Sequence, residues 1–286
     1  MPGNRPLPSC PAAPAIEVIP GSGGPLLLSV PHSGRDYPEA LLARSRLGQG
    51  SLERLEDPLV DRLVQGVIDR GAGAVIARAP RAIIDVNRSL GELHPGAILG
   101  RPGEPATPRA RAGLGVVPTR IGGIGDLWRA PISETEFEQR VERVHGPYHQ
   151  ALSEALETLS DKWDDVLLLD CHSMPPRPPG EPNVVFGDRH GTSAAPWLLD
   201  TAEAIARRRG FAVARNIPFA GGHIVERHGV PARGIHAIQV EIDRSAYCQR
   251  DSRSPGPGFD RVAMLFEALA ADLGDLLSRR HQLAAE

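Results

Sequence analysis

Short apolar runs that stop at polar side chains recur along the chain. Val166–Leu169 is followed directly by an acid, a thiol and an imidazole, and Leu26–Val30 is followed by Pro31-His32. Such a run, bounded by a Pro-rich turn, is typical of a central strand in a parallel sheet, where both faces are covered. Because ligand sites in open α/β sheets lie outside the carboxyl ends of such strands, His32 and His172 are candidate site residues. Each also fits a histidine that is simply hydrogen-bonded in a core.

The remaining pattern alternates between further strands and helices. Strands are expected at 74–77, 82–88, 183–188, 211–214 and 236–244. Apolar residues at helical spacing predict helices over 56–70, 133–159 and 196–209 and from 259 toward the end of the chain. The helix at 133–159 opens with a capping box at Ser133, and Gly146-Pro147 should kink or split it. This alternation indicates an α/β fold with a mixed, mainly parallel sheet.

Two stretches stand outside this pattern. Residues 1–24 are expected to be a flexible arm that ends at a Gly-rich turn, and residues 25–286 to be a single α/β domain. Within that domain, 91–131 is rich in Gly, Pro and Arg. A loop of this length is often a lid or a binding loop. A disordered insertion is the alternative for its first half, up to about Arg111.

Composition and charge limit the classes of binding partner and the cellular compartment that we expect. The 32 Lys and Arg residues against 35 Asp and Glu give a net charge of -3, which argues against a nucleic-acid or anionic-membrane surface and favours a small-molecule or protein partner. No run reaches the ~18 apolar residues of a membrane span. Three widely spaced cysteines lack the pattern of a disulfide framework, so we expect a cytoplasmic protein in a reducing compartment. The oligomeric state is left open.

Strand parity sorts the polar residues of the last expected strand, 236–244, by face. Glu241 shares a face with Gln239 and Asp243, and the apolar residues between them point to the other face. A carboxylate in mid-strand is costly to bury unless it has a partner or a task. Glu241 is therefore a candidate functional residue.

The same parity bears on nucleophilic catalysis. Cys171 and His172 are neighbours, so they point to opposite faces of a strand and cannot form a thiolate–imidazolium dyad with each other. Cys171 paired with a distant histidine stays an alternative. No GxSxG, P-loop or GxGxxG motif is present, which removes several other mechanisms.

Metal chemistry accounts for more of these residues. Two histidines and one carboxylate are the usual ligands of a catalytic zinc, which lowers the pKa of a bound water from ~15.7 toward ~7. His32 and His172 supply the nitrogens, and Asp57 and Glu56 compete for the carboxylate. Asp170 is either a further candidate ligand or a hydrogen-bond partner of His172. A purely structural alternative exists for Asp57, because a carboxylate there also suits the first turn of the expected helix at 56–70.

Two further features complete a hydrolytic site. Glu241 is the candidate base for an attacking water, with a pKa that burial can adjust. The strand expected at 82–88 places Asp85 and Asn87 on one face and leaves Arg88 at its end, where a bidentate pair would hold a substrate carboxylate. Together these residues describe a metal-dependent hydrolase that acts on an anionic substrate.

These motifs also resemble those of the N-formylglutamate amidohydrolase family. The resemblance runs from about Leu26 to Tyr247 and depends on six motifs in this order: Ser29–Gly34, Glu56-Asp57 with Val60-Asp61, Ile84–Arg88, Leu169–Met174, Gly221-Gly222-His223 and Gln239–Ile242. The family is related to the zinc carboxypeptidases and acylglutamate deacylases. The resemblance therefore implies a three-layer α/β sandwich around a central mixed, mainly parallel sheet.

For the metal, the resemblance implies His32 and His172 as ligands. In the carboxypeptidase pattern a glutamate follows the first histidine by three residues, and here Arg35 occupies that place. We therefore choose Asp57 as the third ligand. Zinc is the expected cofactor, with another divalent cation as the alternative.

For the reaction, the resemblance implies Glu241 as the base and Asn87-Arg88 as the clamp on a substrate carboxylate. Arg120 or Arg244 is expected to polarise the scissile carbonyl or to bind a second carboxylate. We assign Arg120 to catalysis, and Arg244 and His223 to substrate binding.

The activity implied by the resemblance is hydrolysis of N-formyl-L-glutamate to formate and L-glutamate, as in the final step of a histidine-degradation route. The expected partner is thus a small anionic N-acyl amino acid. One alternative is a related zinc-dependent deacylase or peptidase that acts on another N-acyl amino acid or a short peptide. The other is a non-catalytic metal- or ligand-binding protein with a decayed site.

Overall fold

The computed structural model describes residues 14–101, 107–250 and 253–284. They fall into two compact units: a loop unit, made of the chain up to Glu17, Pro31–Glu56 and Ala77–His149, and a sheet unit, made of Val18–Val30, Asp57–Ile76 and the chain from Gln150 onward. The expectation of a single domain over 25–286 stays a prediction. Residues 1–13 of the expected arm lie outside the described residues. Ile16–Ile19, in contrast, form strand β1, so the expected flexible arm does not extend to residue 24.

A seven-stranded sheet has the order β1-β3-β2-β6-β9-β7-β8. After β1, its strands are β2 (Leu26–Val30), β3 (Gly73–Ala77), β6 (Val166–Met174), β7 (Val184–Gly187), β8 (Val213–Arg215) and β9 (Ile235–Asp243). Strand β2 runs parallel to both β3 and β6, β6 runs parallel to β9, and β7 runs parallel to β8. Only the pairing of β7 with β9 is antiparallel among the pairings described for this sheet. The predicted mixed, mainly parallel α/β sheet is confirmed.

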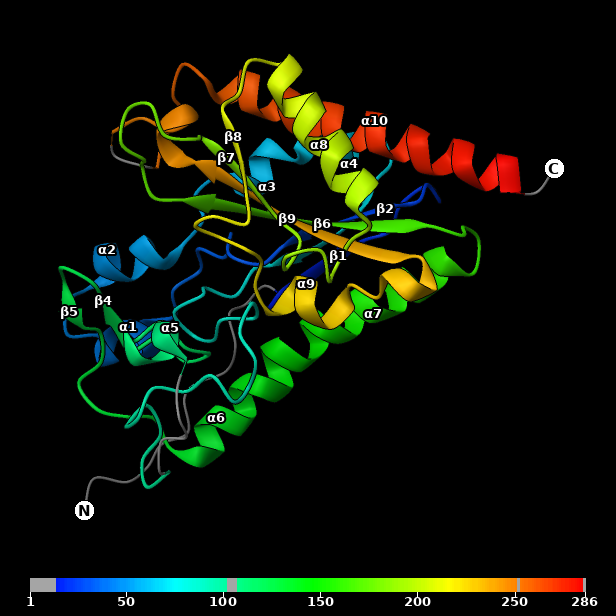
Figure 1. Cartoon of the computed structure of the whole chain (residues 1–286). Coiled ribbons are helices and arrows are strands. Elements are labelled where there is room, and N and C mark those ends of the chain that lie inside the picture. Colours follow the sequence, from blue (N-terminus) through cyan, green and yellow to red (C-terminus); the bar gives the residue numbers. More distant parts are fainter. Residues whose placement is uncertain (1–13, 102–106, 251–252, 285–286) are drawn as a thin grey trace. The chain divides into compact units, whose positions relative to one another are not determined.

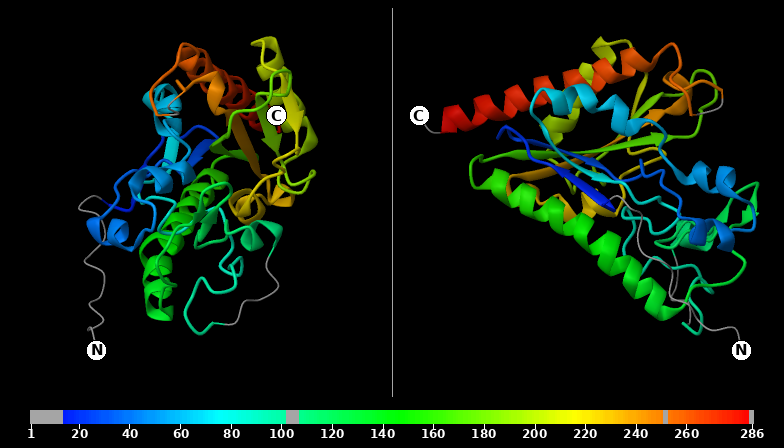
Figure 2. Two further views of the ribbon diagram at one scale, coloured as in Figure 1. Left: turned by 90° about the vertical axis from the view of Figure 1, so that its left-hand side faces the viewer. Right: turned by 180° about the vertical axis from the view of Figure 1, so that it is seen from behind.

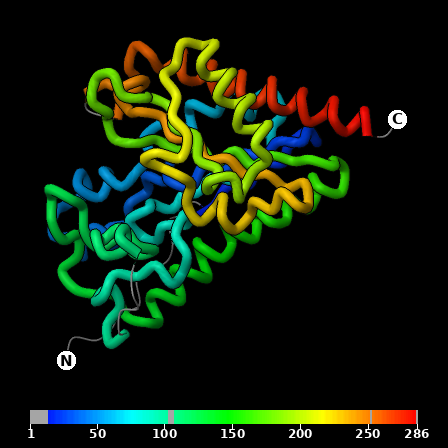
Figure 3. Tube along the Cα trace, in the orientation of Figure 1, coloured from blue at the N-terminus to red at the C-terminus, as the bar shows by residue number. Residues whose placement is uncertain are grey.

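Helices cover both faces of this sheet in the sheet unit (Figure 1). One face carries α3 (Val60–Leu63), α4 (Gln65–Asp69), α8 (Pro196–Arg208) and α10 (Phe259–Ala284), and the other carries α9 (His223–His228) and α7 (Gly146–Ser160) from Gln150 onward. Figure 2 shows the same three layers from the side and from behind. In the Cα trace, α10 runs along α8 (Figure 3). Short 3-10 turns at Pro231–Arg233 and Arg244–Ala246 flank β9.

Alternating residues of the central strands build the core beneath α8 and α10. On β9 these are Ile238, Val240 and Ile242, and on β6 they include Leu169 and Cys171. All nine residues of each of these two strands are buried. Asp170 and His172 on β6, and Gln239 and Glu241 on β9, therefore belong to the opposite face, as parity predicted. None of the helices in the described residues is both long and apolar enough to cross a membrane.

The expected helix at 56–70 is wrong at its start and in its middle. Residues 56–59 are not helical, and Leu59 has a left-handed backbone with φ of 63°. The helix is then divided into α3 and α4 at Val64. Asp57 consequently lies outside the first helical turn, so the structural explanation of its carboxylate does not hold.

The strand expected at 82–88 is also wrong, since this segment folds into turns. The Asp85 carboxylate accepts a hydrogen bond from the backbone N–H of Asn87 at 2.9 Å, and the Arg88 N–H bonds the Asp85 carbonyl at 3.2 Å. An aspartate side chain that accepts a hydrogen bond from the backbone N–H two residues later favours a turn over an extended strand. The expected strands at 74–77, 183–188, 211–214 and 236–244 are confirmed to within about two residues.

The loop unit has its own small apolar cluster, which includes Tyr37, Leu41, Leu52 and Leu127. Its short elements are α1 (Glu39–Arg44), α2 (Gln49–Leu52), a 3-10 turn at Glu53–Leu55, α5 (Pro108–Arg111), β4 (Arg120–Ile121) and β5 (Gly125–Asp126). The last three lie within the Gly/Pro-rich segment 91–131. Residues 102–106 of that segment lie outside the described residues, and its role as a lid or binding loop stays a prediction.

The helix predicted at 133–159 is present in three parts. It begins with α6 (Glu134–Arg140), where the Ser133 hydroxyl accepts a hydrogen bond from the backbone N–H of Glu136, as in the predicted capping box. A π-helical segment at Val141–His145 then precedes α7, which starts at Gly146. The predicted break at Gly146-Pro147 thus takes the form of a π-turn, because proline cannot donate the regular helical hydrogen bond.

Candidate metal centre

The sheet unit brings polar side chains together at the carboxyl ends of β6 and β9. In the parallel register, Asp170 pairs with Gln239 and His172 pairs with Glu241. Partners in register on adjacent parallel strands present their side chains on the same face. Glu241 is therefore the direct neighbour of His172, and both are at least 93% buried.

His172 lies between two carboxylates. Its Nδ1 is 2.9 Å from Asp57 Oδ2, and its Nε2 is 2.8 Å from Asp170 Oδ2. Asp170 is itself oriented by Ser29, whose hydroxyl donates to Oδ1 at 2.7 Å. Burial acts to lower the pKa of His172, but Asp170 and Asp57 outweigh it and raise the pKa well above its ordinary value. Asp170 thus has the expected place as hydrogen-bond partner of His172.

Asp57 and Glu56, the two candidate carboxylate ligands, have different hydrogen-bond partners. Asp57 contacts His172 and also accepts an ion-pair hydrogen bond from Arg244 Nη2 at 3.2 Å. Glu56 instead accepts a hydrogen bond from the Tyr37 hydroxyl at 2.6 Å. Arg244 is fixed further by its Nε, which donates to the Ser173 hydroxyl at 3.1 Å. The geometry therefore favours Asp57 over Glu56 as a partner of His172.

Glu241 is held by a short chain of hydrogen bonds. The Gln239 side chain donates to Glu241 Oε1 at 2.9 Å and accepts from the backbone N–H of Gly222 at 2.8 Å. His223, the next residue, opens α9 and lies 3.9 Å from Glu226 through its Nδ1. The Gly221-Gly222-His223 motif is thus tied to the strand that carries Glu241.

Cys171 points away from these groups, as strand parity predicted. Its side chain belongs to the apolar core, and its thiol donates a weak hydrogen bond to the Leu169 carbonyl at 3.5 Å. Burial, with a contribution from the Asp170 carboxylate, raises the pKa of Cys171 well above its ordinary value. A buried thiol of raised pKa is a poor nucleophile, which argues against the Cys171 alternative.

In the loop unit, Asp85 organises the second histidine. Its Oδ1 lies 2.8 Å from His32 Nε2, and its Oδ2 accepts from Arg81 Nε at 2.8 Å and Nη2 at 2.7 Å. Burial acts to raise the pKa of Asp85, but Arg81, His32 and Arg88 outweigh it and hold the pKa well below its ordinary range. Sequence reasoning gave Asp85 no role, although its place two residues before Asn87 in Ile84–Arg88 was a usable signal.

Asn87 and Arg88 are both buried in the loop unit. Arg88 donates from Nε to the Leu114 carbonyl at 3.1 Å and from Nη1 to the Asn87 carbonyl at 2.9 Å. The Asp85 carboxylate is 3.9 Å from Nε. Burial lowers the pKa of Arg88, and Asp85 opposes this. Two carbonyls thus orient the Arg88 guanidinium, and the Asp85 carboxylate lies at the outer limit of an ion pair with it.

Arg120 has a different environment. It lies on β4, its side chain is 58% exposed, and its Nε pairs with Asp126 of β5 at 2.9 Å. The Asp126 side chain is equally exposed, so this pair contributes little to stability. The predicted catalytic role of Arg120 stays a prediction.

Whether these side chains suit a metal ion can be judged from the hydrogen-bond partner of one ring nitrogen in each histidine. His172 turns Nε2 to Asp170, and His32 turns Nε2 to Asp85. Metal-binding histidines typically use their second ring nitrogen in this way, which fixes the tautomer and leaves Nδ1 as the coordinating atom. Two imidazoles and the Asp57 carboxylate are also the donor types that zinc takes in catalytic sites. Asp57 and His172 in the sheet unit, and His32 in the loop unit, are therefore the candidate metal ligands.

Comparison with known proteins identifies relatives of this chain. The family model described as N-formylglutamate amidohydrolase matches residues 24–248. An N-formylglutamate deformylase of Pseudomonas putida is 29% identical over 234 residues, 79% of this chain and 82% of the relative. One of Pseudomonas aeruginosa is 29% identical over 267 residues, 88% of this chain and 91% of the relative.

Solved structures agree with the sequence match. The crystal structure of an N-formylglutamate amidohydrolase from Ralstonia eutropha JMP134 superposes with a TM-score of 0.85 at 29% identity, covering 93% of this chain and 99% of that one. A gene product of Agrobacterium tumefaciens shares the fold, with a TM-score of 0.63 at 19% identity over 96% of this chain and 95% of its own. Since the family match spans most of the chain and contains all six motifs, the chain belongs to the N-formylglutamate amidohydrolase family.

Proposed function

We propose that this protein is a metal-dependent amidohydrolase that converts N-formyl-L-glutamate and water to formate and L-glutamate. The observation that carries the proposal is the register of β6 and β9, which sets Glu241 beside His172 while Asp57 and Asp170 hold both nitrogens of that imidazole. Family membership and the names of the two Pseudomonas relatives support the choice of substrate.

In this proposal His32, Asp57 and His172 hold the metal, with zinc as the expected ion. His32 is included because it follows β2 by two residues, and β2 pairs with β6 in register at Ser29 and Asp170. A divalent cation at such a ligand set supplies a Lewis acid for the formyl carbonyl and lowers the pKa of a water molecule. Asp170 and Asp85 keep the two imidazoles in the tautomer that coordinates through Nδ1.

Glu241 is the proposed base. Its carboxylate takes a proton from the attacking water as the water oxygen bonds to the formyl carbon. It then delivers that proton to the amide nitrogen as the C–N bond breaks, which releases formate and the amine of glutamate. The Gln239 hydrogen bond to Oε1 restricts the rotation of the carboxylate. Arg120, or Arg244 as the alternative, stabilises the negative charge that develops on the carbonyl oxygen.

Substrate binding is assigned to the cationic and amide side chains. Arg88 and Asn87 clamp one carboxylate of the substrate, since two backbone carbonyls orient the buried Arg88 guanidinium. Arg244 and His223 are the candidates for the second carboxylate. The buried thiol of Cys171 supports a reducing compartment, in keeping with a cytoplasmic enzyme in a histidine-degradation route.

The test is formate release by the purified protein from a panel of N-formyl-L-glutamate, N-formyl-L-glutamine, N-formyl-L-aspartate and N-acetyl-L-glutamate. We expect the highest kcat/KM for N-formyl-L-glutamate, loss of turnover after chelation and recovery on adding Zn²⁺. Preference for another acyl amino acid would favour the related-deacylase alternative. Bound metal without hydrolysis of any panel member would favour a binding protein, and full turnover after metal stripping would refute the metal mechanism.

A further inference from the structure

One face of the helical stretch from α6 to α7 donates hydrogen bonds to the irregular segment 83–88. Arg140 Nη1 donates to the Ile83 carbonyl at 2.6 Å, His149 Nε2 bonds the Val86 carbonyl at 2.9 Å, and His145 Nε2 bonds the Arg88 carbonyl at 2.9 Å. The three donor side chains are all buried. A buried segment without sheet or helix pairing needs such donors, because its carbonyls cannot reach water.

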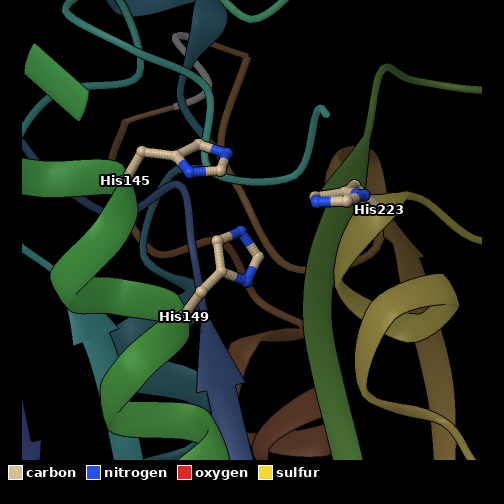
Figure 4. Close-up of side chains that lie close together, drawn as sticks. All are labelled: His145, His149 and His223. Carbon is tan, nitrogen blue, oxygen red and sulfur yellow. The ribbon is translucent and has the colours of Figure 1, made fainter. Parts of the chain in front are cut away.

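The two histidines act as a pair. They lie four positions apart on the helix, and Figure 4 shows both side chains pointing to the same side of it. Their ring centroids are 4.6 Å apart, with the rings tilted by 50°. Because a carbonyl oxygen only accepts, Nε2 carries the proton in both rings. Figure 4 also labels His223, which belongs to the sheet unit at the start of α9.

These bonds fix the peptide planes on both sides of Asn87. The plane between Val86 and Asn87 is held at its carbonyl by His149 and at its N–H by Asp85. The next plane is held at the Asn87 carbonyl by Arg88 and at the Arg88 N–H by the Asp85 carbonyl. The plane after Arg88 is held at its carbonyl by His145. The backbone that carries the clamp therefore has little rotational freedom left.

We propose that His145 and His149 are positioning residues for the Asn87-Arg88 substrate clamp, a role that depends on the proposed function of Arg88. Displacing a binding group by about 1 Å can cost a hundredfold in activity. Loss of the His149 donor frees the peptide plane before Asn87, and loss of the His145 donor frees the plane after Arg88. In either case the guanidinium no longer meets the substrate carboxylate in one orientation. The chemical step at Glu241 does not use these groups.

The experiment compares His145→Leu and His149→Leu with the donor-retaining variants His145→Gln and His149→Gln. We expect the leucine variants to raise KM for N-formyl-L-glutamate about tenfold or more while kcat changes less than about threefold, and the glutamine variants to recover most of the loss. His236→Leu is the matched control, since His236 is an equally buried histidine whose Nε2 contacts Asp165 far from the clamp in sequence. Its KM should stay at the wild-type value.

An Arg88→Met background separates positioning from a general loss of stability. If the histidines act through Arg88, His149→Leu should cost no further kcat/KM in that background, whereas independent effects would add. Unchanged KM in the leucine variants, or an additive loss in the Arg88→Met background, would overturn the proposal.

Hydrogen exchange gives a readout that does not depend on the substrate. Amides of residues 85–89 should exchange faster in the leucine variants than in the wild type or in His236→Leu. Equal exchange would overturn the proposal even if turnover changed. If the wild type does not hydrolyse N-formyl-L-glutamate, the proposed function fails, and the KM comparison moves to the panel substrate that is cleaved while the exchange measurement stands unchanged.

Discussion

Replacing Asp85 with asparagine tests how strongly the buried carboxylate holds the loop unit together. Asp85 has no exposed surface, and its two oxygens accept from His32, the Asn87 N–H and two nitrogens of Arg81. Asparagine keeps one acceptor oxygen but turns an NH₂ group toward another donor. Arg81, whose side chain is 16% exposed, would lose its charge partner. Breaking a buried pair in this way typically costs 3–5 kcal/mol.

We therefore expect Asp85→Asn to lower the free energy of unfolding by about 3 kcal/mol, the lower end of that range, because removing the buried charge also relieves its desolvation. Urea unfolding at pH 7 followed by circular dichroism measures this as a lower midpoint at unchanged slope. Arg81→Met and the double variant complete a cycle, in which the coupling between the two side chains should exceed about 1 kcal/mol. A loss below about 1 kcal/mol, or no coupling to Arg81, would refute this account of Asp85.

Two further changes test other parts of the chain. Glu241→Gln should leave the free energy of unfolding within about 1 kcal/mol of the wild type and lower kcat for formate release at least a hundredfold. Near-normal turnover would exclude Glu241 as the base. Burial, with Arg227 beside it, lowers the pKa of His228 from 6.5 to about 4. Between these values the unfolded chain binds more protons, so this group reduces stability as the pH falls from 6.5 to 4, by about 3 kcal/mol in all. His228→Gln should remove that part of the pH dependence in urea unfolding, and a constant difference from the wild type across this window would contradict the assignment.

Much of the sheet could be predicted from local pattern alone. The runs that became β2, β6 and β9 are apolar because parallel strands are covered on both faces. Within each strand, the period of two separated Glu241 from the apolar residues of β9, and Cys171 from His172 on β6. The register of β6 against β9 is not a local property. It took the structure to show that His172 and Glu241 are direct partners rather than two residues that merely share a face.

The spacing of Glu56 and Asp57 did not by itself distinguish the two carboxylates, for a similar reason. Glu56 and Asp57 are adjacent, and both suit the start of a helix. The left-handed backbone at Leu59 delays the helix to Val60, and this leaves Asp57 to bond His172, which is 115 positions away along the chain. A prediction from spacing has no access to a contact at that separation.

Segment 82–88, which carries the proposed substrate clamp, shows why the strand predicted there was wrong. Its apolar residues resemble a strand, yet its carbonyls are taken by Arg140, His145 and His149, 57 to 63 positions further along the chain, rather than by a neighbouring strand. A strand would have fixed Asn87 and Arg88 by hydrogen bonds to a neighbouring strand, with their side chains on opposite faces of the sheet. The turn instead brings the Asp85 carboxylate to His32 and to the Asn87 backbone at once. The departure from strand geometry is thus what lets one short segment orient a candidate metal ligand and carry the proposed substrate clamp.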